Sequence, residues 1–153
     1  MNYGFDDYEA AILKALASLK VENGSYLKTL KGYAGELDED AALDNFLRGF
    51  PGVLVEVSEA DYSVLDIVQD YQETRVNLLV GARSFRSQDQ ARGGDAGAFT
   101  ILKDLRRLLN RKDLGLEIRP LQIRKETKLA SSPKTVIYLA EYVIINDSVT
   151  EEV

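Results

Sequence analysis

The chain has 153 residues, of which 45% are hydrophobic, and a formal net charge of −6, which suits one globular domain with a core of its own. It contains no histidine and no cysteine, which excludes disulfides, thiolate metal sites and any nucleophile activated by histidine. No apolar run is long enough to cross a bilayer, and residues 1–10 lack the pattern of a secretory signal, so we expect the chain to fold in the cytosol.

The N-terminal quarter predicts a helix followed by a strand. Apolar residues recur at helical spacing through residues 6–24 and form one stripe. Asp6 is the expected N-cap, with Glu9 completing a capping box, and Gly24 is the expected stop. Residues 25–35 are rich in tyrosine and threonine, which favours a strand.

The next segments predict a second helix and a pair of strands. Residues 38–52 form a short helix with an acidic first turn, ended by glycine and proline. Its acids lack the spacing of a calcium loop, so we interpret them as helix-dipole partners and expect no metal site. Residues 53–60 and 73–85 read as strands, and residues 61–72 either extend that hairpin or cover it.

A long polar loop with three arginines lies between residues 83 and 99. Its glycines do not have the spacing of a dinucleotide fingerprint or a Walker loop, so no nucleotide cofactor is expected. Asp95 is the predicted N-cap of the helix that follows. Because long polar loops are more often functional than idle, we interpret Arg83, Arg86, Arg92 and Asp95 as candidate partner-binding residues, with a disordered loop as the alternative.

Residues 98–110 give the most periodic helix in the chain, with one apolar face and one basic face. Arg106 and Arg107 lie on the basic face. They are candidates for binding a protein partner, and less so for binding phosphate, because a net acidic chain is a poor nucleic-acid binder. A solvated helix face is the simpler interpretation.

The C-terminal third predicts two strands. Residues 114–130 read as a strand that Pro120 interrupts, which places it at a sheet edge or at a bulge. Residues 131–134 form a turn, and residues 135–146 form a long, central strand. Residues 147–153 are polar and are expected to fray.

The order of these elements predicts an α+β fold. Adjacent strands favour hairpins over repeated parallel crossovers, so we expect one domain over residues 1–153. It would hold a mixed, mostly antiparallel sheet of four or five strands, with about three helices packed mainly on one face.

Charge is unevenly distributed along the chain. Residues 1–70 carry 14 acids and 5 bases, and residues 82–128 carry 12 bases and 6 acids. Two solvated surfaces would explain this. The alternative is a pair of complementary faces through which identical subunits meet head to tail, since such contacts close into rings.

The sequence provides few catalytic groups, so we expect no enzyme, no catalytic residue and no cofactor. Two rival functions stay open. One is a small enzyme that uses paired carboxylates, for which Asp95 and Glu117 are the candidates. The other is a nucleic-acid module that reads phosphates through Arg106 and Arg107.

Four segments follow one another in a familiar order. They are "YEAAILKAL", "YLKTLKGYAGEL", "FLRGFPGVLVEV" and "VNLLVGARSFRSQDQARGGDAGAFTILKDLRRLL". This order, from about Tyr8 to Tyr142, resembles the Mu-like phage tail protein family, in which a proline also leads from the second helix into an apolar strand. Phe99 stands where a tyrosine is commoner in the family. The motifs carry no specific chemistry, and the resemblance rests on their order.

The resemblance implies a structural protein of contractile-tailed phages or prophages. The implied role is a tail terminator, in a tail-terminator-like fold that assembles as a hexameric ring. The ring would cap the tail tube, stop tube and sheath polymerisation, and offer a head-joining surface. The alternative is a head–tail connector or neck protein that docks on the portal side.

The resemblance also implies partners and a location. The partners are further copies of the chain, the tail tube protein, the sheath protein and the head–tail connector protein, with no membrane. DNA would only pass through the ring lumen. The protein would sit in the virion tail after assembly in the cytoplasm of the bacterial host.

Overall fold

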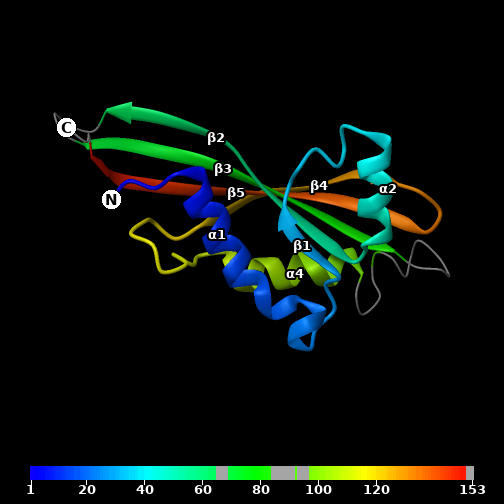
Figure 1. Cartoon of the computed structure of the whole chain (residues 1–153). Helices are drawn as coiled ribbons and strands as arrows, with labels where there is room; N and C mark the ends of the chain where they lie inside the picture. The colour runs from blue at the N-terminus through cyan, green and yellow to red at the C-terminus, as the bar shows by residue number, and fades with distance from the viewer. Residues whose placement is uncertain (65–68, 84–91, 93–96, 151–153) are drawn as a thin grey trace.

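The structure is a computed structural model and describes residues 1–64, 69–83, 92 and 97–150. These parts of the chain form three α-helices and one five-stranded sheet (Figure 1). The elements are α1 (Phe5–Leu16), β1 (Thr29–Gly32), α2 (Asp40–Arg48), β2 (Gly52–Val64), β3 (Gln69–Arg83), α4 (Ala98–Leu109), β4 (Gln122–Ser131) and β5 (Thr135–Thr150). The predicted single-domain α+β fold is confirmed.

The sheet is mixed and mostly antiparallel, as predicted. Its strands lie in the order β1-β2-β3-β5-β4. Only β1 runs parallel to its neighbour, because α2 connects it to β2, and the other three pairs are antiparallel. Residues 61–64 extend β2 and residues 69–72 belong to β3, so the ambiguous segment extends the hairpin.

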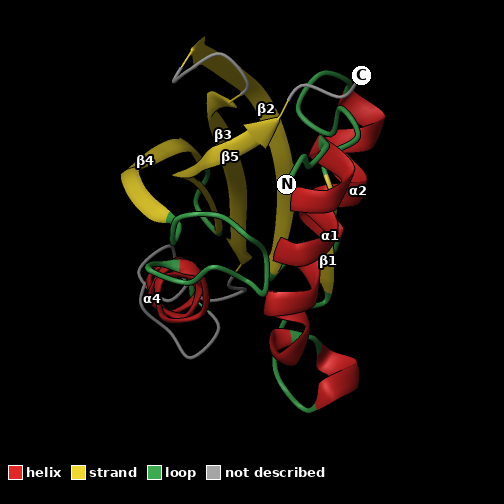
Figure 2. Ribbon diagram, turned by 90° about the vertical axis from the view of Figure 1, so that its left-hand side faces the viewer, coloured by secondary structure: helices red, strands yellow, loops and turns green. Residues whose placement is uncertain are grey.

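The main core lies between one face of the sheet and the helices α1 and α4 (Figures 1 and 2). Each helix buries the apolar stripe predicted from its period, with Tyr8, Ile12 and Leu16 from α1 fully buried. Alternate residues of the strands meet them. These are Val53 and Val55 from β2, Val76, Leu78, Val80 and Ala82 from β3, and Val136, Ala140, Tyr142 and Ile144 from β5.

A second, smaller core lies on the opposite face of the sheet under α2. Phe46 and Phe50 pack edge to face there, with ring centroids 4.6 Å apart. They cover Leu54, Leu79 and Ile137. Two of the three α-helices in the described parts of the chain therefore share one face, and α2 covers one end of the other.

The arm is our name for the part of the sheet that extends past α1, away from α2, and it consists of residues 56–64 of β2 and 70–77 of β3. Strand β5 accompanies both, and both termini lie at this end of the molecule (Figure 1). A bulge between Val57 and Glu59 lies near the start of the arm in β2.

Helix α1 begins two residues earlier than predicted. Gly4 is the N-cap, and its N–H donates to the Asp7 carboxylate at 2.7 Å. The prediction of Asp6 as the cap is therefore wrong, because the acid three residues after the cap makes the reciprocal bond. The helix ends at Leu16, eight residues before the predicted stop at Gly24, and two short 3-10 turns carry the chain from there to Gly24. Gly24, with a φ of 84°, ends the second of these turns instead of the helix.

The C-terminal strands also differ from the prediction in their limits. Strand β4 begins at Gln122, so residues 114–119, predicted as strand, form a loop before Pro120. The strand lies at the sheet edge and carries two bulges, as its proline indicated. Residues 147–150 continue β5, where Val149 and Thr150 pair with β3 instead of fraying, while 151–153 lie outside the described residues.

Candidate interaction surfaces

The basic face of α4 is tied to the rest of the protein by ion pairs. Nη1 of Arg106 lies 3.0 Å from Oε1 of Glu126 on β4. Nη2 of Arg107 lies 3.6 Å from Oδ1 of Asp104, and Oδ2 of the same carboxylate accepts a hydrogen bond from the Tyr26 hydroxyl. Both predicted partner-binding arginines thus have a role within the fold. Arg107 stays 63% exposed and still presents its charge to solvent.

Burial and the neighbouring acids raise the pKa values of two tyrosines below this face. Burial, followed by the hydrogen bond to Asp104, raises the pKa of Tyr26. Burial, followed by the charge of Glu126, raises the pKa of Tyr142. The Arg106–Glu126 ion pair joins α4 to β4, and the Tyr26 hydroxyl joins Asp104 of α4 to the segment before β1.

The predicted binding loop is described only at its ends. Arg83 closes β3, pairs with Thr135 of β5 and is exposed. Arg92 is half-buried. Arg86 and Asp95 lie outside the described residues. The N-cap of α4 is Gly97, two residues later than the predicted cap at Asp95. The proposal that this loop binds a partner stays a prediction.

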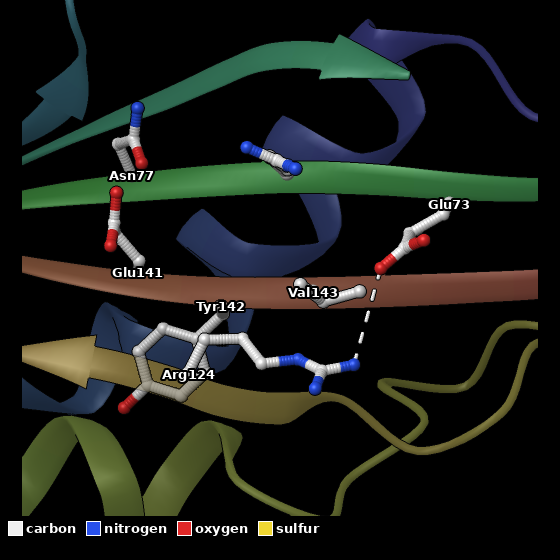
Figure 3. Close-up of a pocket in the computed structure, with 7 residues that line it drawn as sticks. Glu73, Asn77, Arg124, Glu141, Tyr142 and Val143 are labelled. Atoms are coloured by element: carbon white, nitrogen blue, oxygen red, sulfur yellow. Dashed lines mark ion pairs between the residues drawn. The ribbon is translucent and has the colours of Figure 1, made fainter. Parts of the chain in front are cut away.

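Charged side chains occupy the open part of the second sheet face, beyond α2. A pocket there is lined by Glu73, Arg75, Asn77, Arg124, Glu141, Tyr142 and Val143 (Figure 3). Arg124 reaches Glu73 across β5 at 4.0 Å, and Arg75 pairs with Glu59 of β2 at 3.1 Å. Because acids and bases alternate across the strands, this face suits a charged protein surface rather than an apolar ligand.

The two edges of the sheet carry opposite charge. Glu59, Asp61 and Asp70 lie on the arm. On the far side, β4 exposes Arg124, Lys125 and Lys128. Asp61, Lys125 and Lys128 form no ion pair within the described chain. The charge asymmetry of the sequence therefore becomes a spatial asymmetry across one sheet.

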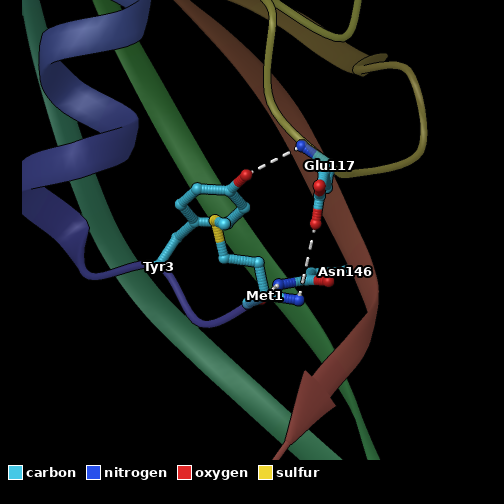
Figure 4. A network of polar contacts seen from close by, with 4 residues as sticks. All are labelled: Met1, Tyr3, Glu117 and Asn146. Atoms are coloured by element: carbon cyan, nitrogen blue, oxygen red, sulfur yellow. Dashed lines mark hydrogen bonds and ion pairs between the residues drawn. The ribbon is translucent and has the colours of Figure 1, made fainter.

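A polar network joins the N-terminal segment to β5 and to the loop before β4 (Figure 4). The side-chain amide of Asn146 donates to the Met1 carbonyl at 2.9 Å, and the Glu117 N–H donates to the Tyr3 hydroxyl at 2.8 Å. The Met1 amino group lies 3.9 Å from the Glu117 carboxylate. Glu117, one half of the candidate carboxylate pair, is thus exposed and engaged with the N-terminus, while Asp95 lies outside the described residues.

A second set of bonds joins α1 to the arm. The Tyr8 hydroxyl donates to Gln72 at 2.6 Å, and Gln72 in turn donates to the Tyr62 hydroxyl at 2.8 Å. Burial raises the pKa of Tyr8 to about 12. Gln72 is 2% exposed, so this network fixes the part of the arm near its tip to α1.

Sequence reasoning did not identify the arm as a surface. The available signal was the pattern after Val57, where Glu59 and Asp61 alternate with Ala60 and Tyr62. Such a pattern is typical of a strand with one solvated face.

Two further classes of site are absent from the described parts of the chain. No three acidic side chains there gather closely enough to hold a metal ion. None of the helices placed by the structure has the length and apolar character that a bilayer crossing requires.

Comparison with known proteins supports the resemblance to a Mu-like phage family that the order of the segments suggested. No curated protein sequence matches the chain significantly. A protein-family model described as "Bacteriophage Mu, Gp37" matches residues 7–144, which span all the described helices and strands except the start of α1 and the end of β5. Since this match covers most of the sequence, the chain belongs to the bacteriophage Mu Gp37 family and is a phage structural protein.

Proposed function

We propose that this protein is a tail terminator, which caps the tail tube as a homohexameric ring. The ring stops tube and sheath polymerisation and presents the head-joining surface. The observation that carries the proposal is the family match over residues 7–144, together with the order of segments that resembles phage tail proteins. Its place is the virion tail, after assembly in the host cytoplasm.

The surface chemistry supports a ring of identical subunits. A ring requires two different, complementary patches on each copy. The acidic arm and the basic strand β4 lie on opposite sides of one sheet and provide such a pair. A net charge of −6 also suits a ring that lets DNA pass without holding it.

The tube-facing contact is assigned to the segment between β3 and α4. Arg83 ends β3 where this segment begins, Arg86, Arg92 and Asp95 belong to the segment, and Arg106 and Arg107 follow on α4. In this proposal the segment contacts the tube and sheath proteins, and no catalysis, cofactor or metal is involved. The absence of histidine and cysteine from the chain supports that assignment.

Two measurements test this function. Light scattering across a salt series gives the mass of the purified protein, and we expect a hexamer that loosens as salt weakens acid–base contacts. The protein is then added to polymerising tube protein, and tube lengths are measured by negative-stain microscopy. A terminator shortens the length distribution and decorates one tube end.

Two results would overturn the proposal. A monomer at every salt concentration that also leaves tube growth unchanged removes the terminator role. Capture by connector protein but not by tube protein, in parallel pull-downs, assigns the chain to the neck as a connector.

A further inference from the structure

We infer that the subunits join by pairing two free sheet edges: the outer edge of β2 in one copy (Glu56–Val64) with the outer edge of β4 in the next (Gln122–Ser131). This inference rests on the proposed ring and specifies its contact. The occupant of each edge is a second copy of this chain. Topology, edge length, apolar exposure and charge all favour this pairing.

Both edges are open within the described part of the chain. Strand β1 pairs only with Gly52–Val55, so β2 has no strand on its outer side from Glu56 onward. Strand β4 is the last strand on the other side of the sheet. The Ile123 N–H at the start of β4 donates to the Asn110 side chain, and beyond it both edges have no neighbouring strand of the described chain over a similar length. Open edges of this kind are templates for pairing with another chain.

Strand direction favours this pairing. Three successive antiparallel pairs separate β2 from β4, so the two strands run in opposite directions within one copy. A second copy that continues the sheet in the same orientation therefore places its β4 antiparallel to β2. Antiparallel pairing is the more stable arrangement per residue.

The two free edges are displaced along the strands. Val57 stands level with Ile123, as the register through Val76 and Tyr142 shows. From that level the free part of β2 runs toward the arm tip, and β4 runs toward α2. Adjacent copies offset by four residues, about 13 Å at 3.3 Å each, would bring Asp61 opposite Lys125 and overlap most of both edges. Strands staggered in this way are tilted when a sheet closes on itself.

Apolar side chains are exposed on both edges. Tyr62 is 60% exposed and Val64 is 79% exposed at the arm tip, while Leu129 on β4 is 46% exposed. A contact with a second copy would bury these side chains, and aromatic residues such as Tyr62 are enriched in protein interfaces.

Charge favours the pairing of β2 with β4 over the two symmetric pairings, β2 with β2 and β4 with β4. The β2 edge carries Glu59 and Asp61, and the β4 edge carries Lys125 and Lys128. Two β2 edges would repel each other, as would two β4 edges, because like charges on paired strands are destabilising. Only the β2–β4 contact brings opposite charges together, and that contact is head to tail.

The same docking adds a second complementary contact. Strand β1 leads into an acidic segment with the exposed Asp38 and Glu39, which leaves the sheet beside Val55. A β4 strand docked on Glu56–Val64 would bring its following turn, with the exposed Lys134, to that segment.

Cysteine cross-linking tests the inference directly, because the chain contains no cysteine of its own. The variants are Asp61→Cys, Lys125→Cys and the double variant. Within one copy the two positions lie at least three strand spacings apart, about 14 Å, which is too far for a disulfide. Every disulfide formed under mild oxidation is therefore intermolecular.

We expect a specific pattern of products, both for the free protein and on tube ends. Each single variant alone stays uncross-linked, an equal mixture of the two gives dimers, and the double variant gives a ladder up to the ring. Dimers from a single variant would show a symmetric contact and overturn the inference. Rings or decorated tube ends without any cross-link would overturn it while leaving the terminator role intact.

Charge reversal gives the matched functional test. Glu59→Lys with Asp61→Lys, and separately Lys125→Glu with Lys128→Glu, should each lower the self-association constant at least tenfold. The four changes combined in one chain should restore it, because the edges are again complementary. Lys14→Glu with Lys28→Glu, a reversal of equal size at exposed positions away from both edges, is the control and should leave association unchanged. Failure of the combined variant to recover would exclude the charge pairing.

Discussion

Gly81 is a position where the structure predicts a large effect from adding a single methyl group. It lies in β3 between Gly52 and Ile137, directly under the ring of Phe50. A Cβ built on Gly81 would stand 2.0 Å from Cε1 and 2.2 Å from Cζ of that ring. Ordinary carbon contacts are about 3.5–4.0 Å, so the ring would have to move by roughly 1.5 Å.

The ring has little freedom to move. Phe50 is 2% exposed and packs edge to face on Phe46, so α2 would have to shift with it. Overpacking of this kind costs about 1–3 kcal/mol. For a chain of this size, Gly81→Ala should therefore lower the melting temperature by about 2–12 °C. The free energy of unfolding is measured by denaturant titration with far-ultraviolet circular dichroism, since the chain has no tryptophan.

Gly32→Ala is the matched control. A Cβ on Gly32 would also come within 2.0 Å of a neighbouring atom, but that atom is Oε1 of Glu9, at the end of a flexible and partly exposed side chain. The carboxylate can rotate away, so we expect a change within about 0.5 kcal/mol. Adding Phe50→Leu to Gly81→Ala should cost less than the sum of the two single changes. Equal effects of Gly81→Ala and Gly32→Ala would refute the reasoning.

Three other predictions concern the main core, the loop and alkaline pH. Leu105→Ala should cost about 2–5 kcal/mol in the same titration, because Leu105 is fully buried under the sheet, and a loss below about 1 kcal/mol would contradict that packing. Replacing Arg86 and Arg92 by alanine should leave the free energy of unfolding within about 0.5 kcal/mol and weaken assembly in light scattering; a loss of folding would be the contrary result. Burial raises the pKa of Tyr8 from its ordinary value of 10.0 to about 12, so between these values the unfolded chain binds fewer protons than the folded one. Stability should fall as pH rises through that window, and Tyr8→Phe should reduce the slope, which denaturant titrations at several alkaline pH values would show.

Local pattern was sufficient to predict most helices and strands. The apolar stripe of α4, with Ile101, Leu105 and Leu109, has helical period, and all three residues are buried in the structure. The continuous apolar run at Val53–Val55 also indicates burial on both faces of the strand, which the prediction did not state. A strand that is apolar at successive positions is buried on both faces, and α2 does lie on the face opposite to α1 and α4.

Features that depend on distant residues were not predictable. Arg106 appeared as a free cation on a helix face, because nothing local indicates its partner Glu126, 20 residues later. Likewise, local pattern left residues 61–72 ambiguous, because the contact that holds Gln72 comes from Tyr8, 64 residues earlier in the chain. The candidate contact edges became visible only once the strand order was known.

The shortness of β1 has a consequence for hydrogen exchange. Strand β3 lies between β2 and β5 along nearly its whole length, so its amides should exchange last. The part of β2 beyond Val57 has a neighbour on one side only, and its outward-facing amides should exchange quickly in a free subunit. Slowing of that exchange in residues 58–64 would then serve as a built-in reporter, which distinguishes an assembled subunit from a free one without any label.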